Sequence, residues 1–124
     1  MYSVFTKNAP APSGPYSQGS SAARNVYISG QYPLMSDSKT LVQGTISALT
    51  QQTINNIEAI LTDVDLTLQD ICQATLYVCD FATLPEIDKV WEANFEKPYP
   101  ARTVVKVTEL LYDSPLCVDA IALR

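Results

Sequence analysis

Two charged residues stand inside segments near the C-terminus that otherwise read as apolar strands. Arg102 enters the valine-rich segment 100–107, and Asp119 interrupts the apolar segment 116–123. A carboxylate with apolar neighbours on both sides is costly to bury unless a cation or hydrogen bonds compensate it. Such groups are over-represented at functional sites. If the two strands pair, both side chains can face one cleft, where the guanidinium holds an anion and the carboxylate handles water.

The same two residues also have a purely structural interpretation. Arg102 can serve to neutralise Asp119 in an ion pair, and backbone groups can satisfy a buried acid equally well. The residues alone leave both interpretations open.

Composition limits the classes of protein to consider. The 124 residues, 47% of them apolar, predict a single globular domain over 1–124. The net charge of −5 argues against nucleic acid and anionic membranes as partners, because both need concentrated Lys and Arg. No apolar run approaches the ~20 residues of a membrane span, and the N-terminus does not resemble a secretory signal. A cytoplasmic location is therefore expected.

The residues that most often ligate metals or act as nucleophiles are scarce. There is no histidine, and the three cysteines (Cys72, Cys79 and Cys117) have no CxxC spacing. These counts exclude Ser-His-Asp and Cys-His catalysis and argue against a zinc site. The cysteines are expected to be small buried hydrophobes in a reducing compartment.

The first 44 residues predict strands separated by a stiff loop. Short strands are expected at 3–7, 25–29 and about 31–34, with Gly30 ending the second. The prolines and glycines of residues 8–19 forbid regular structure, so this loop presents its side chains rigidly.

The remainder of the chain predicts helix, strand, helix and two final strands. Thr45 is placed to cap the first helix, and Thr83 to cap the second, which covers 84–95. A strand is expected at 71–79 between them. The apolar face of the first helix has three- and four-residue spacing: Ile46, Leu49, Thr53, Ile54, Ile57, Ile60, Leu61 and Val64.

The last strand is apolar on both faces, which two helices on one face cannot cover. Leu116, Val118, Ala120 and Ala122 lie on one side, and Cys117, Ile121 and Leu123 on the other. Association with identical chains is expected, and sites often form at such junctions.

Several motifs resemble the RidA/YjgF family of reactive intermediate deaminases. They are residues 14–18 (GPYSQ), 29–31 (SGQ), 53–61, 100–103 (PART) and 120–122 (AIA). The resemblance implies a chorismate-mutase-like α+β fold, with a mixed sheet, two helices on one face, and a homotrimer with clefts between subunits. It implies a hydrolase acting on C–N bonds that converts 2-iminobutanoate and 2-iminopropanoate (2-aminoacrylate) to 2-keto acids and ammonia. Neither a metal nor an organic cofactor is implied.

Individual roles follow from the resemblance. Arg102 matches the arginine that grips the substrate carboxylate, for which a planar guanidinium suits. Asp119 takes the place of the glutamate assigned to water activation. Tyr16 matches a pocket-lining tyrosine, and Gly30 a glycine whose backbone approaches the ligand. Ser29 and Thr103, within the same motifs, complete the expected substrate-binding set: Tyr16, Ser29, Gly30, Arg102 and Thr103.

Three positions depart from the family pattern. Asp119 replaces glutamate, Val104 stands where many deaminating members have cysteine, and Asp88 where many have asparagine. They support an alternative hypothesis, a non-catalytic trimer of the same family that binds small carboxylates and acts as a regulator. An isomerase of the chorismate-mutase type ranks third, because it needs several cations around a dianion.

Overall fold

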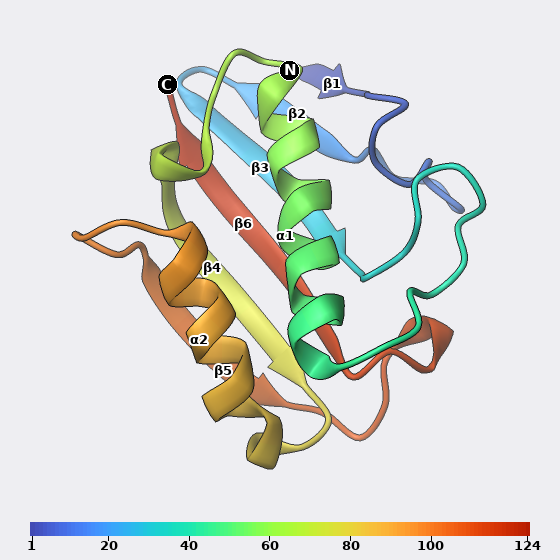
Figure 1. Cartoon of the computed structure of the whole chain (residues 1–124). Coiled ribbons are helices and arrows are strands. Elements are labelled where there is room, and N and C mark those ends of the chain that lie inside the picture. The colour runs from blue at the N-terminus through green and yellow to red at the C-terminus, as the bar shows by residue number, and fades with distance from the viewer.

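The structure, a computed structural model, describes all residues from 1 to 124. Six strands form one mixed sheet in the order β1-β2-β3-β6-β4-β5, and two α-helices lie side by side on one face of it (Figure 1). The strands are β1 (Tyr2–Val4), β2 (Gly19–Ala22), β3 (Asn25–Gln31), β4 (Ile71–Val78), β5 (Ala101–Lys106) and β6 (Leu116–Leu123). The helices are α1 (Ile46–Thr62) and α2 (Leu84–Asn94). The expected α+β class is confirmed.

Helix α1 forms where its apolar spacing predicts it. Thr45 is the N-cap, and its hydroxyl accepts a hydrogen bond from the Ala48 N–H at 3.2 Å. The apolar stripe faces the sheet and supplies much of the core: Leu49, Ile54, Ile57, Ile60 and Leu61. Neither helix is both long and apolar enough to cross a membrane.

Helix α2 begins at the expected residue but is capped differently. A 3₁₀ turn at Phe81–Thr83 precedes it, and Asp80 caps that turn by accepting from the Ala82 N–H. Thr83 makes no capping hydrogen bond with its side chain, so that part of the prediction is wrong. Ile87 and Trp91 are buried against the sheet.

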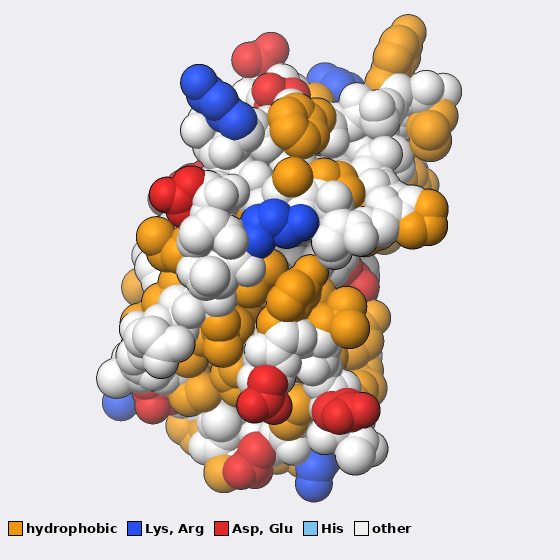
Figure 2. Space-filling model, turned by 90° about the vertical axis from the view of Figure 1, so that its right-hand side faces the viewer, with side chains coloured by type: hydrophobic (Ala, Val, Ile, Leu, Met, Phe, Trp, Pro, Cys, Tyr) orange, Lys and Arg blue, Asp and Glu red, His pale blue; other side chains and the backbone are white.

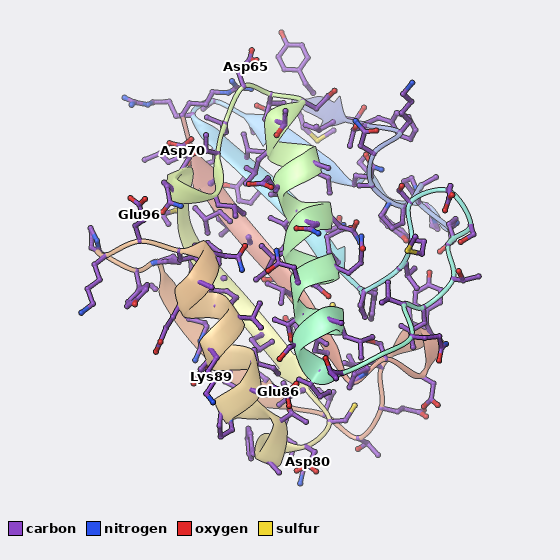
Figure 3. The ribbon with its side chains drawn as sticks, in the orientation of Figure 1. Asp65, Asp70, Asp80, Glu86, Lys89 and Glu96 are labelled. Carbon is purple, nitrogen blue, oxygen red and sulfur yellow. The ribbon has the colours of Figure 1, made fainter.

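Polar side chains fix the two helices relative to each other. Glu86, labelled between the helices in Figure 3, accepts from the Ser47 N–H at 2.7 Å and from its hydroxyl at 2.9 Å. An acid placed there also complements the positive N-terminal end of α1. Farther along, Gln51 and Asn94 exchange two amide hydrogen bonds at 3.0 and 2.9 Å. These contacts hold α2 in place over the edge of the sheet.

The N-terminal strands differ from the prediction. β1 covers Tyr2–Val4 and β3 extends through Gln31, while no strand runs from 31 to 34, where Leu34 makes only an isolated bridge to Leu41. β2 (Gly19–Ala22) was not predicted. Its small polar sequence has no apolar alternation, and it becomes a strand because β1 and β3 pair with it on both sides.

The two C-terminal strands do not pair, so the condition for Arg102 and Asp119 to face one cleft within the chain is not met. β5 pairs only with β4, in parallel, and β6 lies between β3 and β4. Arg102 is in register with Ala74 of β4, whereas Asp119 is in register with Thr75. Neighbouring residues of a strand point to opposite faces, so Arg102 lies on the helix face and Asp119 on the open face.

No helix covers the open face of the sheet (Figure 1). Apolar and aromatic side chains lie on it, including Tyr27 and Leu123, which are 41% and 44% exposed. The expectation that the last strand is apolar on both faces is confirmed, because its alternate residues Val118, Ala120 and Ala122 are buried under the helices.

Candidate functional site

Arg102 lies at the edge of the sheet, on the outermost strand β5 and beneath α2. Its Nη1 is 2.8 Å from Asp88 Oδ1, and its Cζ is 5.1 Å from the centre of the Trp91 ring. The arginine side chain is 23% exposed. Trp91 in turn stacks on Phe95, with ring centres 4.5 Å apart. Helix α2 therefore orients the guanidinium with one ion pair and one cation–π contact.

The contact with Asp88 is ionic and not a directional hydrogen bond. Asp88 Oδ1 is shielded from solvent, yet no N–H of the guanidinium is aligned to donate to it. No other side chain or carbonyl accepts from Arg102 either. A guanidinium carries five N–H donors in a planar fork, so this one keeps its donors available to a ligand.

A hollow of about 270 Å³ opens beside the guanidinium. Its lining carries one base and two acids, Asp88 and Glu92, together with aromatic rings that give the hollow apolar walls. The lining residues are Asp88, Trp91, Glu92, Tyr99, Pro100 and Arg102. This hollow is the site at which Arg102 can meet a small molecule.

Asp119 occupies a different part of the molecule. Ser29 and Gly30 form a bulge in β3 and together stand opposite Asp119 on β6. The Tyr77 hydroxyl donates to Asp119 Oδ2 at 3.0 Å, and this bond to a carboxylate raises the pKa of Tyr77. The half-buried acid is therefore compensated by a hydroxyl and not by Arg102.

Thr103 lies on the same face of the sheet as Asp119 and not on the face of its sequence neighbour Arg102. Thr103, Thr75 and Asp119 are in register across three strands, so all three side chains lie on the open face. Arg102 and Thr103, two neighbouring members of the expected substrate-binding set, thus face opposite sides of the sheet.

Tyr16, Ser29 and Gly30 do come together. The Ser29 hydroxyl donates to the Ser17 carbonyl at 2.7 Å, which ties the loop that carries Tyr16 to β3. A Cβ added at Gly30 would lie 2.8 Å from Cys117 Sγ, so a larger residue there would require the buried Cys117 side chain to move. Tyr16 and Gly30 line one small hollow of about 20 Å³, room for about one water molecule.

Hydroxyl groups from distant segments meet at Tyr16. Ser13 Oγ lies 3.3 Å from the Tyr16 hydroxyl and 3.1 Å from that of Tyr112. The hydrogen bonds from Ser13 lower the pKa of Tyr16. Figure 2 shows the side of the molecule with the N-terminal loop, where apolar and aromatic groups lie exposed and basic and acidic groups are scattered. Half of the Tyr16 side chain is exposed to solvent.

Gln18 holds this loop from inside. It is 1% exposed, its Oε1 accepts from the Thr6 N–H at 2.7 Å, and its Nε2 lies within 3.2 Å of three backbone carbonyls. Those carbonyls belong to Thr6, Ala9 and Pro10. One buried amide thus satisfies backbone groups that the prolines leave without regular partners.

Sequence reasoning missed four neighbours of the expected residues. The sequence could have predicted Cys117 and Tyr32. Cys117 is two residues before Asp119 and therefore lies on the same face of the strand, and Tyr32 is two residues after Gly30. Burial raises the pKa of the Cys117 thiol to about 12 and also raises that of Tyr32. Trp91 and Tyr112 had no such signal, because only the tertiary fold brings them to Arg102 and Ser13.

The structure therefore divides the expected site residues into separate groups within one chain. Arg102 stands with Asp88 and Trp91 at the β5 edge, whereas Tyr16, Ser29 and Gly30 stand at β3. Three strand spacings, roughly 14 Å, separate β5 from β3. Asp119 and Thr103 lie between them on the open face.

Comparison with known proteins gives matches over nearly the whole chain. A family model described as Endoribonuclease L-PSP matches residues 6–124. A RutC family protein of Pyrococcus horikoshii is 36% identical over 121 residues, which are 98% of this chain and 96% of that protein. A 2-iminobutanoate/2-iminopropanoate deaminase of Salmonella typhimurium is 36% identical, with 98% of this chain and 96% of that protein covered.

Solved structures agree with these matches. RidA of an Antarctic Psychrobacter has a TM-score of 0.96 and 30% identity, with 100% of each chain covered. Escherichia coli TdcF with bound serine has a TM-score of 0.93 and 27% identity, with 100% of this chain and 99% of that chain covered. The fold and these matches over nearly the whole chain define the class of the protein, an α+β domain shared with relatives from archaea and bacteria. The chain belongs to the RidA/YjgF family.

The role of Gln18 gives a first test. Gln18→Leu keeps a similar volume but leaves the Thr6 N–H and the surrounding carbonyls without their partner. We expect the free energy of unfolding to fall by roughly 3 kcal/mol or more, because buried polar groups become unsatisfied. Urea denaturation at a fixed protein concentration measures it. Gln43→Leu, at an exposed glutamine, should change stability by less than about 0.5 kcal/mol; equal effects of the two variants would contradict the prediction.

The raised pKa of Cys117 gives a second test. With a pKa of about 12, roughly one Cys117 in ten thousand is a thiolate at pH 8, and the thiolate is the reactive form. We expect iodoacetamide to leave Cys117 unmodified in the folded protein and to modify all three cysteines in urea, as peptide mass spectrometry would show. Modification of Cys117 before unfolding would show that the thiol is neither protected nor held in its protonated form.

Proposed function

We propose that this protein is an imine deaminase that hydrolyses 2-imino acids such as 2-iminobutanoate and 2-iminopropanoate to 2-keto acids and ammonia. One observation of the structure carries the proposal: the Arg102 guanidinium borders an open hollow and donates no hydrogen bond within its own chain. A relative at 36% identity is named as a deaminase of this kind. A structural neighbour holds bound serine, which is a small amino acid with a carboxylate.

The proposed site forms between subunits of a homotrimer. Arg102 is on an edge strand whose outer side has no partner, and the open face of the sheet carries exposed apolar groups. Both features favour association with further copies of the chain. In this arrangement, the β5 edge of one subunit lies against the Tyr16 loop, Gly30 and Asp119 of the next.

The chemistry requires only binding of the substrate and transfer of the two protons of water to the nitrogen. The substrate carboxylate binds the guanidinium fork of Arg102 through paired hydrogen bonds. Asp119 of the neighbouring subunit takes a proton from the attacking water and passes it to the nitrogen, which gives an amino alcohol. It then moves the hydroxyl proton of the amino alcohol to the nitrogen, so that the C–N bond breaks, ammonia leaves and the C=O bond forms. Tyr16, Ser29, Gly30 and Thr103 complete the walls. The reaction adds one water to the C=N bond and yields a keto acid and ammonia.

A second candidate function rests on the ion pair with Asp88. Because Asp88 already neutralises the guanidinium, the pocket can retain small carboxylates without accelerating their chemistry. The protein would then be a non-catalytic binder of the same family. Binding of a 2-keto acid without any turnover of 2-imino acids would favour this candidate.

A coupled assay tests the deaminase. A pyridoxal-phosphate-dependent dehydratase releases 2-aminoacrylate or 2-iminobutanoate, and keto acid formation is followed with and without this protein. We expect acceleration, and a loss of roughly a hundredfold in Arg102→Ala, because the substrate is no longer positioned. Arg24→Ala removes a guanidinium that binds only the Arg124 carbonyl and should leave the rate unchanged. No acceleration by the wild-type protein would exclude the deaminase.

Solution mass tests the trimer. We expect light scattering to give three times the mass of the chain for the wild-type protein. Ile121→Lys, which places a charge on the open face, should lower that mass, because the apolar contact is disrupted. Lys89→Glu on the outward side of α2, labelled in Figure 3, should not lower it. A wild-type protein that stays monomeric would contradict the inter-subunit site.

A further inference from the structure

We propose that Asp88 makes the Arg102 hollow selective for ligands that carry a cationic nitrogen beside their carboxylate. Such a ligand is a zwitterionic 2-imino or 2-amino acid, and the disfavoured ligand is the 2-keto acid of the same skeleton. The inference rests on the proposed function in one respect, because it assigns the ligand carboxylate to Arg102.

The charge of the hollow favours a zwitterion. Arg102 contributes one positive charge, and Asp88 and Glu92 contribute two negative charges, so the lining has a formal charge of −1. A bare carboxylate adds a further negative charge and competes with Asp88 for the guanidinium. A zwitterion adds no net charge, and its nitrogen offsets the repulsion between its own carboxylate and Asp88.

Asp88 has acceptor capacity that the chain leaves unused. Its side chain is 44% exposed and lines the hollow, while its Oδ1 is shielded from solvent and accepts no hydrogen bond. Shielded carboxylate oxygens normally have a partner. Oδ1 itself lies against Arg102, so an N–H⁺ group of a ligand in the hollow can pair with the exposed part of the same carboxylate.

The spacing of the pair suits one small molecule. Arg102 Nη1 and Asp88 Oδ1 are 2.8 Å apart. In a 2-imino or 2-amino acid, three covalent bonds separate the nitrogen from a carboxylate oxygen, which places them roughly 3 Å apart. The ligand can therefore set its carboxylate on a free edge of the guanidinium and its nitrogen on Asp88 at the same time.

Selectivity of this kind also affects product release. Hydrolysis replaces the nitrogen by a carbonyl oxygen, and ammonia leaves. The keto acid product then lacks the group that Asp88 binds and competes with Asp88 for Arg102. Asp88 thus favours the substrate form over the product form at the same site.

Two ligands with one carbon skeleton test the proposal. L-2-aminobutyrate is the zwitterion, and 2-oxobutyrate is the anion. Their dissociation constants are measured by calorimetry for the wild-type protein, for Asp88→Asn, and for the matched control Glu92→Gln, which removes an acid of the same hollow that does not contact Arg102. We expect Asp88→Asn to shift the ratio of the two constants by about tenfold toward 2-oxobutyrate. Glu92→Gln should shift it by less than about twofold.

The ratio of the two dissociation constants separates selectivity from a purely structural role, because a structural defect would weaken the binding of both ligands alike. An unchanged ratio in Asp88→Asn, an equal shift in Glu92→Gln, or no binding of either ligand to the wild-type protein would overturn the proposal. Arg102→Ala should abolish both bindings, and retained binding would overturn the proposal and the proposed function together. A shifted ratio without accelerated imine hydrolysis would support the selectivity and remove only the catalysis.

Discussion

Side chains along a β-strand alternate between its two faces, and this alternation decides which groups of this molecule can meet. β4 lies between β5 and β6, so both outer strands are in register with it. Arg102 falls beside Ala74 and Asp119 beside Thr75, one residue farther along. That single step sends the cation to the helix face and the carboxylate to the open face. Neither can neutralise the other within one chain, and each remains available to a different surface.

The surroundings of Arg102 orient it without consuming its binding capacity. A partly exposed ion pair contributes about 0–1 kcal/mol, and an exposed cation–π contact about 0.5–1 kcal/mol. Both apply here, because the side chains of Arg102 and Asp88 are 23% and 44% exposed. The free energy gained when a carboxylate binds through two parallel hydrogen bonds exceeds that of either contact. The guanidinium is therefore held in place but can still bind a ligand.

Local signals predicted most elements, and long-range pairing accounts for what they missed. The apolar stripe and Thr45 gave α1 with its cap, because helix periodicity and capping act within a few residues. β2 escaped notice, because its strand character comes from its neighbours and not from its own residues. The hypothesis that Arg102 and Asp119 face one cleft within the chain does not hold for the same reason. The position of β4 between their strands is a property of the whole sheet. The meeting of Tyr16 with Gly30 agrees with the shared motifs, although the contacts through Ser13 and Cys117 depend on tertiary structure.

The amide of Gln18 constrains the length of the N-terminal segment. It binds backbone groups of Thr6 and of Pro10 and thereby fixes both ends of this stretch against the residue that precedes β2. Side chains between these anchors can be exchanged with little strain, since most of them face solvent. A single residue inserted or deleted between Thr6 and Pro10 would move their backbone groups out of reach of the Gln18 amide. It would also shift Tyr16 relative to the small hollow that it lines. For this stretch, length constrains variation more tightly than residue type.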